Sequence, residues 1–200
     1  MHVRPMLVGD VAGVVALQRA CFPEPFPADQ LWQGQHLLAH LITFPEGQFV
    51  ADIKGQIVGS ASALRISEAT WQAHLPWEET LGGFEFRNYE PHGTTLYGAD
   101  ISVHPGFRRR GIARALYEAR FACVRQLGLV RYGTACRIPD FAGSGFEDPG
   151  AYCQAVSERQ RQDRTLSPLL AMGLTLVDVI RDYMPDPESG DSAALLEWIS

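Results

Sequence analysis

The chain has 200 residues, of which 46% are hydrophobic and 20% are charged, and its net charge is -6 at pH 7. This size and composition are typical of one globular domain that folds without a disulfide or a metal, and the negative charge argues against nucleic acid or an anionic membrane as a partner. The four cysteines form no C-x-x-C pair, and neither an apolar leader nor a long apolar run is present. We therefore expect a reduced, cytoplasmic protein without a metal site.

Hydrophobic periodicity and turn residues predict strands that alternate with helices, interrupted by two irregular insertions at 67–95 and 138–164. Before the first insertion we expect a strand 2–6, a helix from the N-cap Asp10 to before Pro23, a helix 28–42, and strands 48–53 and 56–66 joined by Lys54-Gly55. Between the two insertions we expect a strand 96–103, a helix 111–127 and a strand 129–137. The rest of the chain should form a helical stretch 149–164, a short helix 167–172, and strands 174–180 and 193–199. The first insertion is rich in aromatic residues, so we expect an ordered flap over a site rather than disorder. Together the elements predict a single α/β (α+β) domain with a mixed sheet.

A basic loop connects the strand 96–103 to the helix that follows it. The loop reads Arg108-Arg109-Arg110-Gly111-Ile112-Ala113. The first amides of a helix lack intrahelical acceptors and, with the helix dipole, attract anions, while Gly111 and Ala113 let a ligand approach the backbone closely. A merely solvated basic turn would need neither these small residues nor a buried strand before them. The pattern therefore predicts phosphate binding, although neither a P-loop nor a dinucleotide fingerprint is present.

The same loop resembles a known motif. Arg108-x-x-Gly111-x-Ala113, following Val103-His104-Pro105, is similar to motif A of the GNAT acetyltransferases. Val3-Arg4-Pro5 with Gly9-Asp10, and Gly173-Leu174, resemble other landmarks of that family. The insertions resemble the branch of GNAT domains joined to carbon–nitrogen hydrolases, on the residues Leu96-Tyr-Gly-Ala-Asp100, Arg137-Ile-Pro139, Tyr183-Met-Pro-Asp-Pro-Glu-Ser189 and Leu195-Leu-Glu-Trp198.

The resemblance implies a single GNAT-like domain over residues 1–200, with about seven strands splayed between the fourth and the fifth. It implies acetyl-CoA as cosubstrate and direct transfer of the acyl group to a small-molecule or protein amine. The pyrophosphate is then expected on the backbone amides of 109–113, with Arg108, Arg110 and Arg114 adding positive charge. The pantetheine arm is expected along Ile101, Ser102 and Val103, and the amide of Val103 is expected to face the thioester carbonyl.

The catalytic groups are less well defined by the resemblance. Asp100 is the acidic residue on the expected fourth strand and is the candidate general base, or else a structural carboxylate. Strand parity places it on the face opposite Tyr97, Ala99 and Ile101 unless a bulge intervenes. The family's usual proton donor, a tyrosine, is replaced by Leu169. The rival bases are Glu85, Glu90 and His92, and the candidates for a substitute donor are Tyr97, Tyr152, Ser167 and water.

Other functions remain as alternatives. Leu169 motivates a non-catalytic acyl-CoA sensor, and the three arginines motivate nucleic-acid binding, which the net charge disfavours. His36 and His40 share a helical face, but Leu37 stands where a zinc-protease helix has glutamate, and Cys153 has no activating base nearby in sequence. Phe84, Phe86 and Tyr89 form either an acceptor pocket or the flap's own core, and a homodimer is left open.

Overall fold

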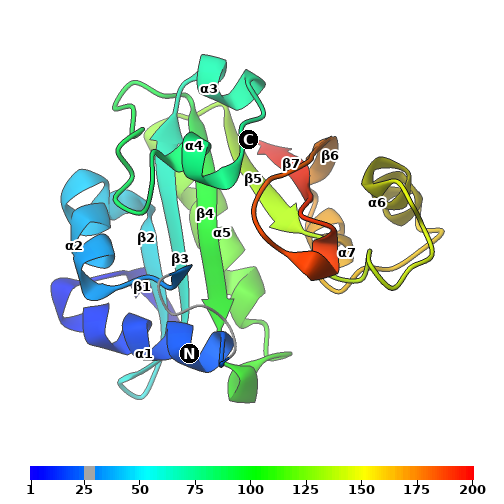
Figure 1. Cartoon of the computed structure of the whole chain (residues 1–200). Helices are drawn as coiled ribbons and strands as arrows, with labels where there is room; N and C mark the ends of the chain where they lie inside the picture. Colours follow the sequence, from blue (N-terminus) through cyan, green and yellow to red (C-terminus); the bar gives the residue numbers. More distant parts are fainter. Residues whose placement is uncertain (25–29) are drawn as a thin grey trace.

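A seven-stranded sheet runs through the molecule in the order β1-β2-β3-β4-β5-β7-β6 (Figure 1). The computed structural model describes residues 1–24 and 30–200. The strands are β1 (His2–Pro5), β2 (Gln48–Ile53), β3 (Gln56–Ile66), β4 (Thr95–Val103), β5 (Arg131–Arg137), β6 (Thr175–Ile180) and β7 (Ala193–Ile199). Neighbouring strands are antiparallel except β4 and β5, which are parallel. The predicted mixed sheet in a single α/β domain is therefore confirmed.

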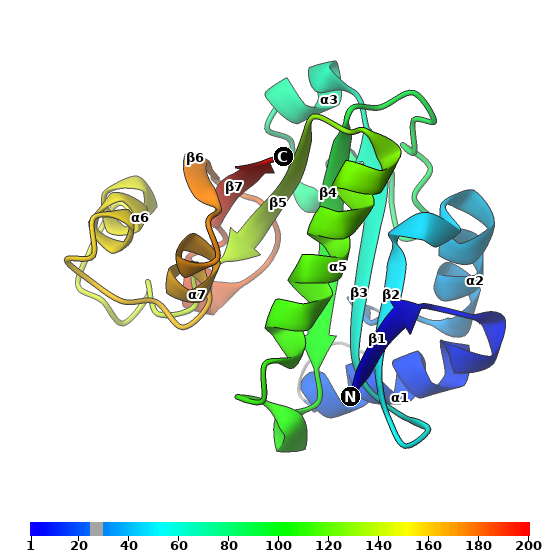
Figure 2. The ribbon, with the colours of Figure 1, turned by 180° about the vertical axis from the view of Figure 1, so that it is seen from behind.

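Helices cover both faces of the sheet. They are α1 (Val11–Cys21), α2 (Gly34–Thr43), α3 (Glu68–Gln72), α4 (Trp77–Leu81), α5 (Ile112–Leu127), α6 (Pro149–Ser157) and α7 (Leu166–Ala171). The long helix α5 lies along one face, α1 and α2 lie on the other, and α6 and α7 form a lobe beside β5, β7 and β6 (Figures 1 and 2). No helix within residues 1–24 and 30–200 combines the length and the apolarity needed to cross a bilayer.

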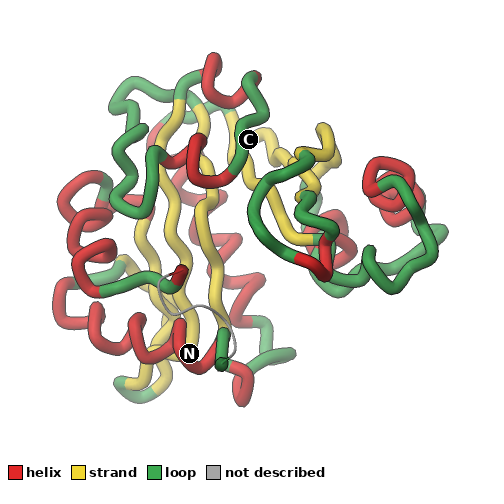
Figure 3. The backbone as a smooth tube through the Cα atoms, viewed as in Figure 1, coloured by secondary structure: helices red, strands yellow, loops and turns green. Residues whose placement is uncertain are grey.

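Each face of the sheet carries its own apolar core. The α5 side buries Ile112, Leu116 and Val124 at helical spacing against β2, β3 and β4. The α1 side buries Val14 and Leu37 together with the aromatic residues of the first insertion. This insertion, 67–95, is ordered as expected: it holds α3 and α4, joined by the loops seen in Figure 3.

Several element boundaries differ from the prediction for local reasons. The helical stretch expected over 149–164 ends at Ser157, because Arg159 adopts a left-handed conformation with φ of 62°. Asp10 is at the N-cap position of α1, but its carboxylate accepts hydrogen bonds from Leu7 N–H and Arg4 and does not cap the helix. The second helix was expected from residue 28; α2 begins at Gly34, and residues 25–29 lie outside the described residues.

The strands β4 and β5 separate along their length, as the resemblance implied. Only Thr95–Gly98 of β4 pair with β5, on Arg131–Thr134, whereas β3 remains paired with β4 as far as Val103. The amide of His104 donates to Val58 of β3. Because successive residues of a strand face opposite edges, the amide and carbonyl of Val103 face the open edge, on the side away from β3. The sheet thus has an unpaired strand edge between β4 and β5, along the part of β4 that follows Gly98.

Candidate active site

A β-bulge lies in the middle of β4, just before the open edge. Asp100 pairs with Ser62 and Gly98 pairs with Ala63, so Ala99 is the extra residue. One extra residue reverses the face to which the following side chains point. Asp100 therefore lies on the α1 side, where Gln18 donates a hydrogen bond to its carboxylate over 3.1 Å. Uninterrupted strand parity would have placed it on the α5 side.

The side chains of Trp77 and Arg120 donate hydrogen bonds to backbone carbonyls at the bulge. The indole N–H of Trp77 donates to the carbonyl of Ala99 over 3.0 Å. The guanidinium of Arg120 donates to the carbonyls of Ser62, over 2.8 Å, and of Asp100. Neither contact was anticipated, and Arg120 had a signal that was overlooked, namely a charged residue at the i+4 position after Leu116 in an apolar stripe.

The surroundings of Asp100 change its acidity. Burial raises the pKa of the Asp100 carboxyl, and the positive charge of Arg120 and hydrogen bonds from Trp32, Gln18 and Ser102 oppose that rise. Burial prevails, so the carboxyl holds a proton more readily than an exposed aspartate does. A carboxylate of raised pKa is a stronger proton acceptor, which suits a general base.

The loop before α5 has the geometry of an anion site. Gly111, the N-cap, has φ of 77° and Arg109 has φ of 60°. The first intrahelical hydrogen bond of this turn runs from Ala115 N–H to Gly111 C=O, so the amides at 112–114 point back toward the loop. A Cβ at Gly111 would have no heavy atom within 4 Å, and Ala113 is exposed. The backbone here is open to a ligand.

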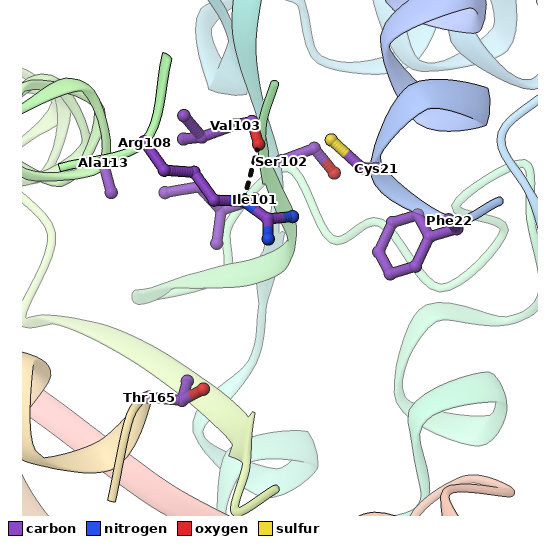
Figure 4. A pocket seen from close by; sticks show the side chains of 8 residues that line it. All are labelled: Cys21, Phe22, Ile101, Ser102, Val103, Arg108, Ala113 and Thr165. Atoms are coloured by element: carbon purple, nitrogen blue, oxygen red, sulfur yellow. Dashed lines mark hydrogen bonds between the residues drawn. The ribbon is translucent and has the colours of Figure 1, made fainter. Parts of the chain in front are cut away.

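A cavity of about 310 Å³ extends along the open edge of β4 (Figure 4). It is lined by Cys21, Phe22, Ile101, Ser102, Val103, Arg108, Ala113 and Thr165. The side chain of Arg108 crosses it and donates to the carbonyl of Val103 over 3.3 Å. Thr165, which directly precedes α7, contributes to the cavity wall from the α6–α7 lobe (Figure 4).

Half of the ten predicted coenzyme residues come together here. Ile101, Ser102, Val103, Arg108 and Ala113 line this one cavity. Arg109, Arg110 and Arg114 are exposed and do not line it, and Arg110 lies 5.2 Å from the ring of Phe107. The side chain of Ile112 is buried in the core. The sequence did not indicate that Cys21 and Thr165 contribute to the walls, because they come from distant parts of the chain.

The proposed proton donors lie elsewhere. Tyr97 is 2% exposed, its hydroxyl lies 3.0 Å from that of Tyr183, and burial raises its pKa to about 12. The hydroxyl of Tyr152 donates to Asp163, and Ser167 accepts from the amide of Asp163. These hydroxyl groups hold the fold together, and none of the three residues is among those lining the cavity.

Two of the three rival bases and one of the flap aromatics also have structural partners. Glu90 accepts from the amide of Ser67, Glu85 pairs with Arg87 at 3.1 Å, and His92 is exposed. Phe86 is 1% exposed and stacks on His40, which favours a core role for it.

The remaining candidates for a reactive site are held in the interior. His40 bonds through Nε2 to the carbonyl of Phe84 over 2.7 Å, and burial raises the pKa of the Cys153 thiol to about 12. Across the described part of the chain, no three or more His, Cys, Asp or Glu residues are grouped so as to hold a metal ion.

The fold and the site have the features of one class of protein. The mixed sheet separates between β4 and β5, and β4 leads through a loop that contains glycine into the start of α5. The profile of the acetyltransferase (GNAT) family matches residues 11–142. The chain therefore belongs to that family, and it is an N-acetyltransferase that uses an acyl-CoA cosubstrate.

Particular relatives are known in Bacillus subtilis (strain 168). The chain is 35% identical to the uncharacterized N-acetyltransferase YkwB over 99% of this chain and 88% of that protein. It is 34% identical to the probable hydrolase YhcX over 99% of this chain but only 38% of that longer protein. The resemblance to hydrolase-joined domains remains a prediction.

Solved structures share the fold. The GNAT-like decarboxylase GphF in complex with isobutyryl-CoA has a TM-score of 0.81 at 22% identity, over 100% of this chain and 99% of that chain. The loading GNATL domain of CurA from Lyngbya majuscula has a TM-score of 0.81 at 16% identity, over 99% and 96% of the two chains. An aminoglycoside 6'-N-acetyltransferase complexed with coenzyme A has a TM-score of 0.64 at 14% identity, over 100% and 97%.

Proposed function

We propose that this enzyme transfers an acetyl group from acetyl-CoA directly to a small-molecule or protein amine. The open edge of β4 beside the start of α5 is the observation that carries the proposal. There, a strand edge able to bond an extended pantetheine arm leads within ten residues to a helix start able to bind phosphate. The cavity along this edge supports the same placement.

The coenzyme is assigned to three sets of groups. The amides of 109–113 take the pyrophosphate, with positive charge from Arg108, Arg110 and Arg114. The pantetheine arm lies along Ile101, Ser102 and Val103, and the amide of Val103 donates to the thioester carbonyl, whose oxygen gains negative charge as the amine attacks. Arg108 must leave the carbonyl of Val103 for the arm to bond there.

Asp100 is assigned as the general base. It takes the proton of the amine as the new C–N bond forms and the C–S bond breaks. The departing thiolate then gains a proton, which we assign to water because the hydroxyl of Tyr97 is buried and already paired. The raised pKa of Asp100 supports its role as acceptor.

Calorimetry and a thiol-release assay test the proposal. Acetyl-CoA should bind more tightly than ATP or NAD, and a panel of amines should contain one that releases free CoA. Clear binding of ATP with no heat from acetyl-CoA would contradict it. Binding of acetyl-CoA without turnover across the panel would favour the acyl-CoA sensor.

A second candidate is decarboxylation of an acyl-CoA that carries an extra carboxylate. It is motivated by the GNAT-like decarboxylase GphF, which shares the fold with a TM-score of 0.81 at 22% identity. That reaction breaks a C–C bond, releases CO₂ and leaves a thioester enolate that takes up a proton, so no amine is consumed. Incubation with malonyl-CoA in the absence of an amine distinguishes the two reactions: acetyl-CoA and CO₂ appear only if the enzyme decarboxylates.

A further inference from the structure

Arg120 is a charged side chain in the interior, 1% exposed, on the α5 face that packs against the sheet. A guanidinium keeps its charge in a protein, so it requires several partners when it is buried. Besides the carbonyls of Ser62 and Asp100, it donates to the hydroxyl of Tyr132 over 2.9 Å. The rings of Tyr117 and Tyr132 lie 5.4 and 5.6 Å from the guanidinium.

These partners are on three adjacent strands. Ser62 belongs to β3, Asp100 to β4 and Tyr132 to β5, so the guanidinium spans the place where β4 leaves β5. In a continuous parallel ladder, the backbone of β4 beyond Gly98 would bond to β5. Arg120 donates to the carbonyl of Asp100, two residues beyond the last residue of β4 that pairs with β5.

Gly98 marks the same boundary. It is the last residue of β4 that pairs with β5, and a Cβ there would collide with the hydroxyl of Tyr132. That hydroxyl is held by Arg120. The hydrogen-bond ladder between β4 and β5 thus ends at Gly98, where Tyr132 and Arg120 are also in contact.

We propose that Arg120 is a positioning residue for acyl transfer: its guanidinium holds the bulge at Ala99 and the separation of β4 from β5, and so fixes both the open edge at Val103 and the direction of the Asp100 carboxylate. The part that concerns Asp100 rests on the proposed function. The part that concerns the open edge needs only coenzyme binding.

The charge of Arg120 also acts on Asp100. Among the described residues, the titratable or charged groups that interact electrostatically with this carboxyl are Arg120, from the α5 face of the sheet, and Cys21 from α1, with Arg108 interacting in turn with Cys21. Burial and Asp100 raise the pKa of the Cys21 thiol, so Cys21 remains a neutral thiol. Arg120 lowers the pKa of Asp100 against the effect of burial. Loss of its charge should therefore move the acidic limb of kcat/KM to higher pH.

The test compares two substitutions of Arg120. Arg120→Lys keeps the charge but cannot bridge several acceptors as a planar fork does. It should leave the acidic limb near its original pH while kcat falls by about 10²-fold, the effect of a reacting group misplaced by about 1 Å. Arg120→Met should lower kcat at least as much, weaken acetyl-CoA binding and also shift the acidic limb upward.

Two further variants provide the controls. Arg125→Met changes an exposed arginine of the same helix, which lies 5.4 Å from the ring of Trp198, and should leave all three quantities unchanged. Tyr132→Phe removes one acceptor of Arg120 while keeping the ring, and should shift kcat in the same direction by less. It tests the proposal even if Arg120→Met fails to fold.

The outcomes separate the two assignments. Folded Arg120→Lys and Tyr132→Phe proteins with normal kcat, coenzyme affinity and pH profile would overturn the positioning role. Normal turnover of Asp100→Asn would refute the base assignment alone. In that case weaker coenzyme binding by Arg120→Met would still support the role of Arg120 at the open edge.

Discussion

Two separate features bear on Gly111, its left-handed backbone and its place in the loop to which the pyrophosphate is assigned in the proposed function. The structure offers a matched comparison in Gly128, which has φ of 63°, caps the other end of α5 and likewise has no heavy atom near an added Cβ. Alanine at either site should cost about 1–2 kcal/mol of stability, the usual strain of a left-handed residue with a side chain.

Only the Gly111→Ala variant should lose coenzyme affinity. Displacing one charge-assisted hydrogen bond costs about 1.5–3 kcal/mol, which corresponds to about a 10–150-fold increase in Kd. Calorimetry with acetyl-CoA and thermal melts of both variants provide the measurements. Equal affinity in the two folded variants would place the phosphates elsewhere.

Asp100→Asn addresses the base directly. Asparagine keeps the size of the side chain and can still accept from Gln18, but it cannot take a proton. Turnover should fall by about 10²–10⁴-fold while acetyl-CoA affinity changes little. Melting temperature and turnover are measured together: a variant that melts much lower yet turns over normally in the cold would make Asp100 structural.

At the scale of elements, the carboxylate of Asp163 fixes the start of α7, which contributes to the wall of the cavity. Asp163 is 2% exposed and accepts hydrogen bonds from the amides of Thr165 and Leu166, each at 2.8 Å, and from the hydroxyl of Tyr152. It therefore fixes the start of α7 and, with it, the cavity-lining Thr165.

Asp163→Asn should raise KM for acetyl-CoA and lower the melting temperature, with a smaller effect on kcat, because the wall of the cavity shifts while Asp100 keeps its contacts. Asp140→Asn is the control, since Asp140 accepts from the amide of Arg164 in the same lobe and is not among the cavity-lining residues. Steady-state kinetics at varied acetyl-CoA check the comparison. Equal KM values in both variants would contradict the link between Asp163 and the cavity.

Elements with strong periodicity were predictable from the sequence, whereas the arrangement of the site was only partly so. The stripe of α5 and the glycine that precedes it were enough to place the helix and the loop. Periodicity does not show a bulge, because the extra residue Ala99 looks like any other strand residue. For the same reason the sequence placed Asp100 on the strand but left its face dependent on whether a bulge intervenes.

Contacts between distant segments were the other missing information. Arg120 reaches the bulge from α5, and Trp77 reaches it from the first insertion. Both are far in sequence from the carbonyls to which they donate. A buried polar residue within an apolar stripe was the available signal for Arg120 and for Gln18, which is 2% exposed beside Leu17.

At the scale of the whole molecule, a buried histidine links stability to pH. His40 is fully buried, and burial lowers its pKa to about 4, below the roughly 6.5 of an unfolded chain. Between these values the unfolded chain binds a proton that the folded protein does not, so stability falls as the pH is lowered. The contribution of His40 to this loss should be about 2 kcal/mol between pH 7 and pH 5.

Urea unfolding of the wild type and of His40→Gln at both pH values measures this contribution. Glutamine can donate to the carbonyl of Phe84 but does not titrate, so the acid sensitivity of the variant should be smaller by that amount. His36, whose pKa burial also lowers, is present in both proteins and cancels. Identical pH dependence in the two proteins would mean that His40 is protonated in the fold.

The strand order also constrains how the chain is assembled during synthesis. Strand β7 lies between β5 and β6, yet it is made after both, and within residues 1–24 and 30–200 β6 has no other neighbour in the sheet. Strands β1–β4 and their helices can pair as they leave the ribosome, whereas β6 must wait for residues 193–199. Non-local pairing of this kind is slow and leaves strand edges exposed to other chains. The end of the sheet that carries the α6–α7 lobe is thus the part whose folding depends on β7, a strand made after both of its neighbours.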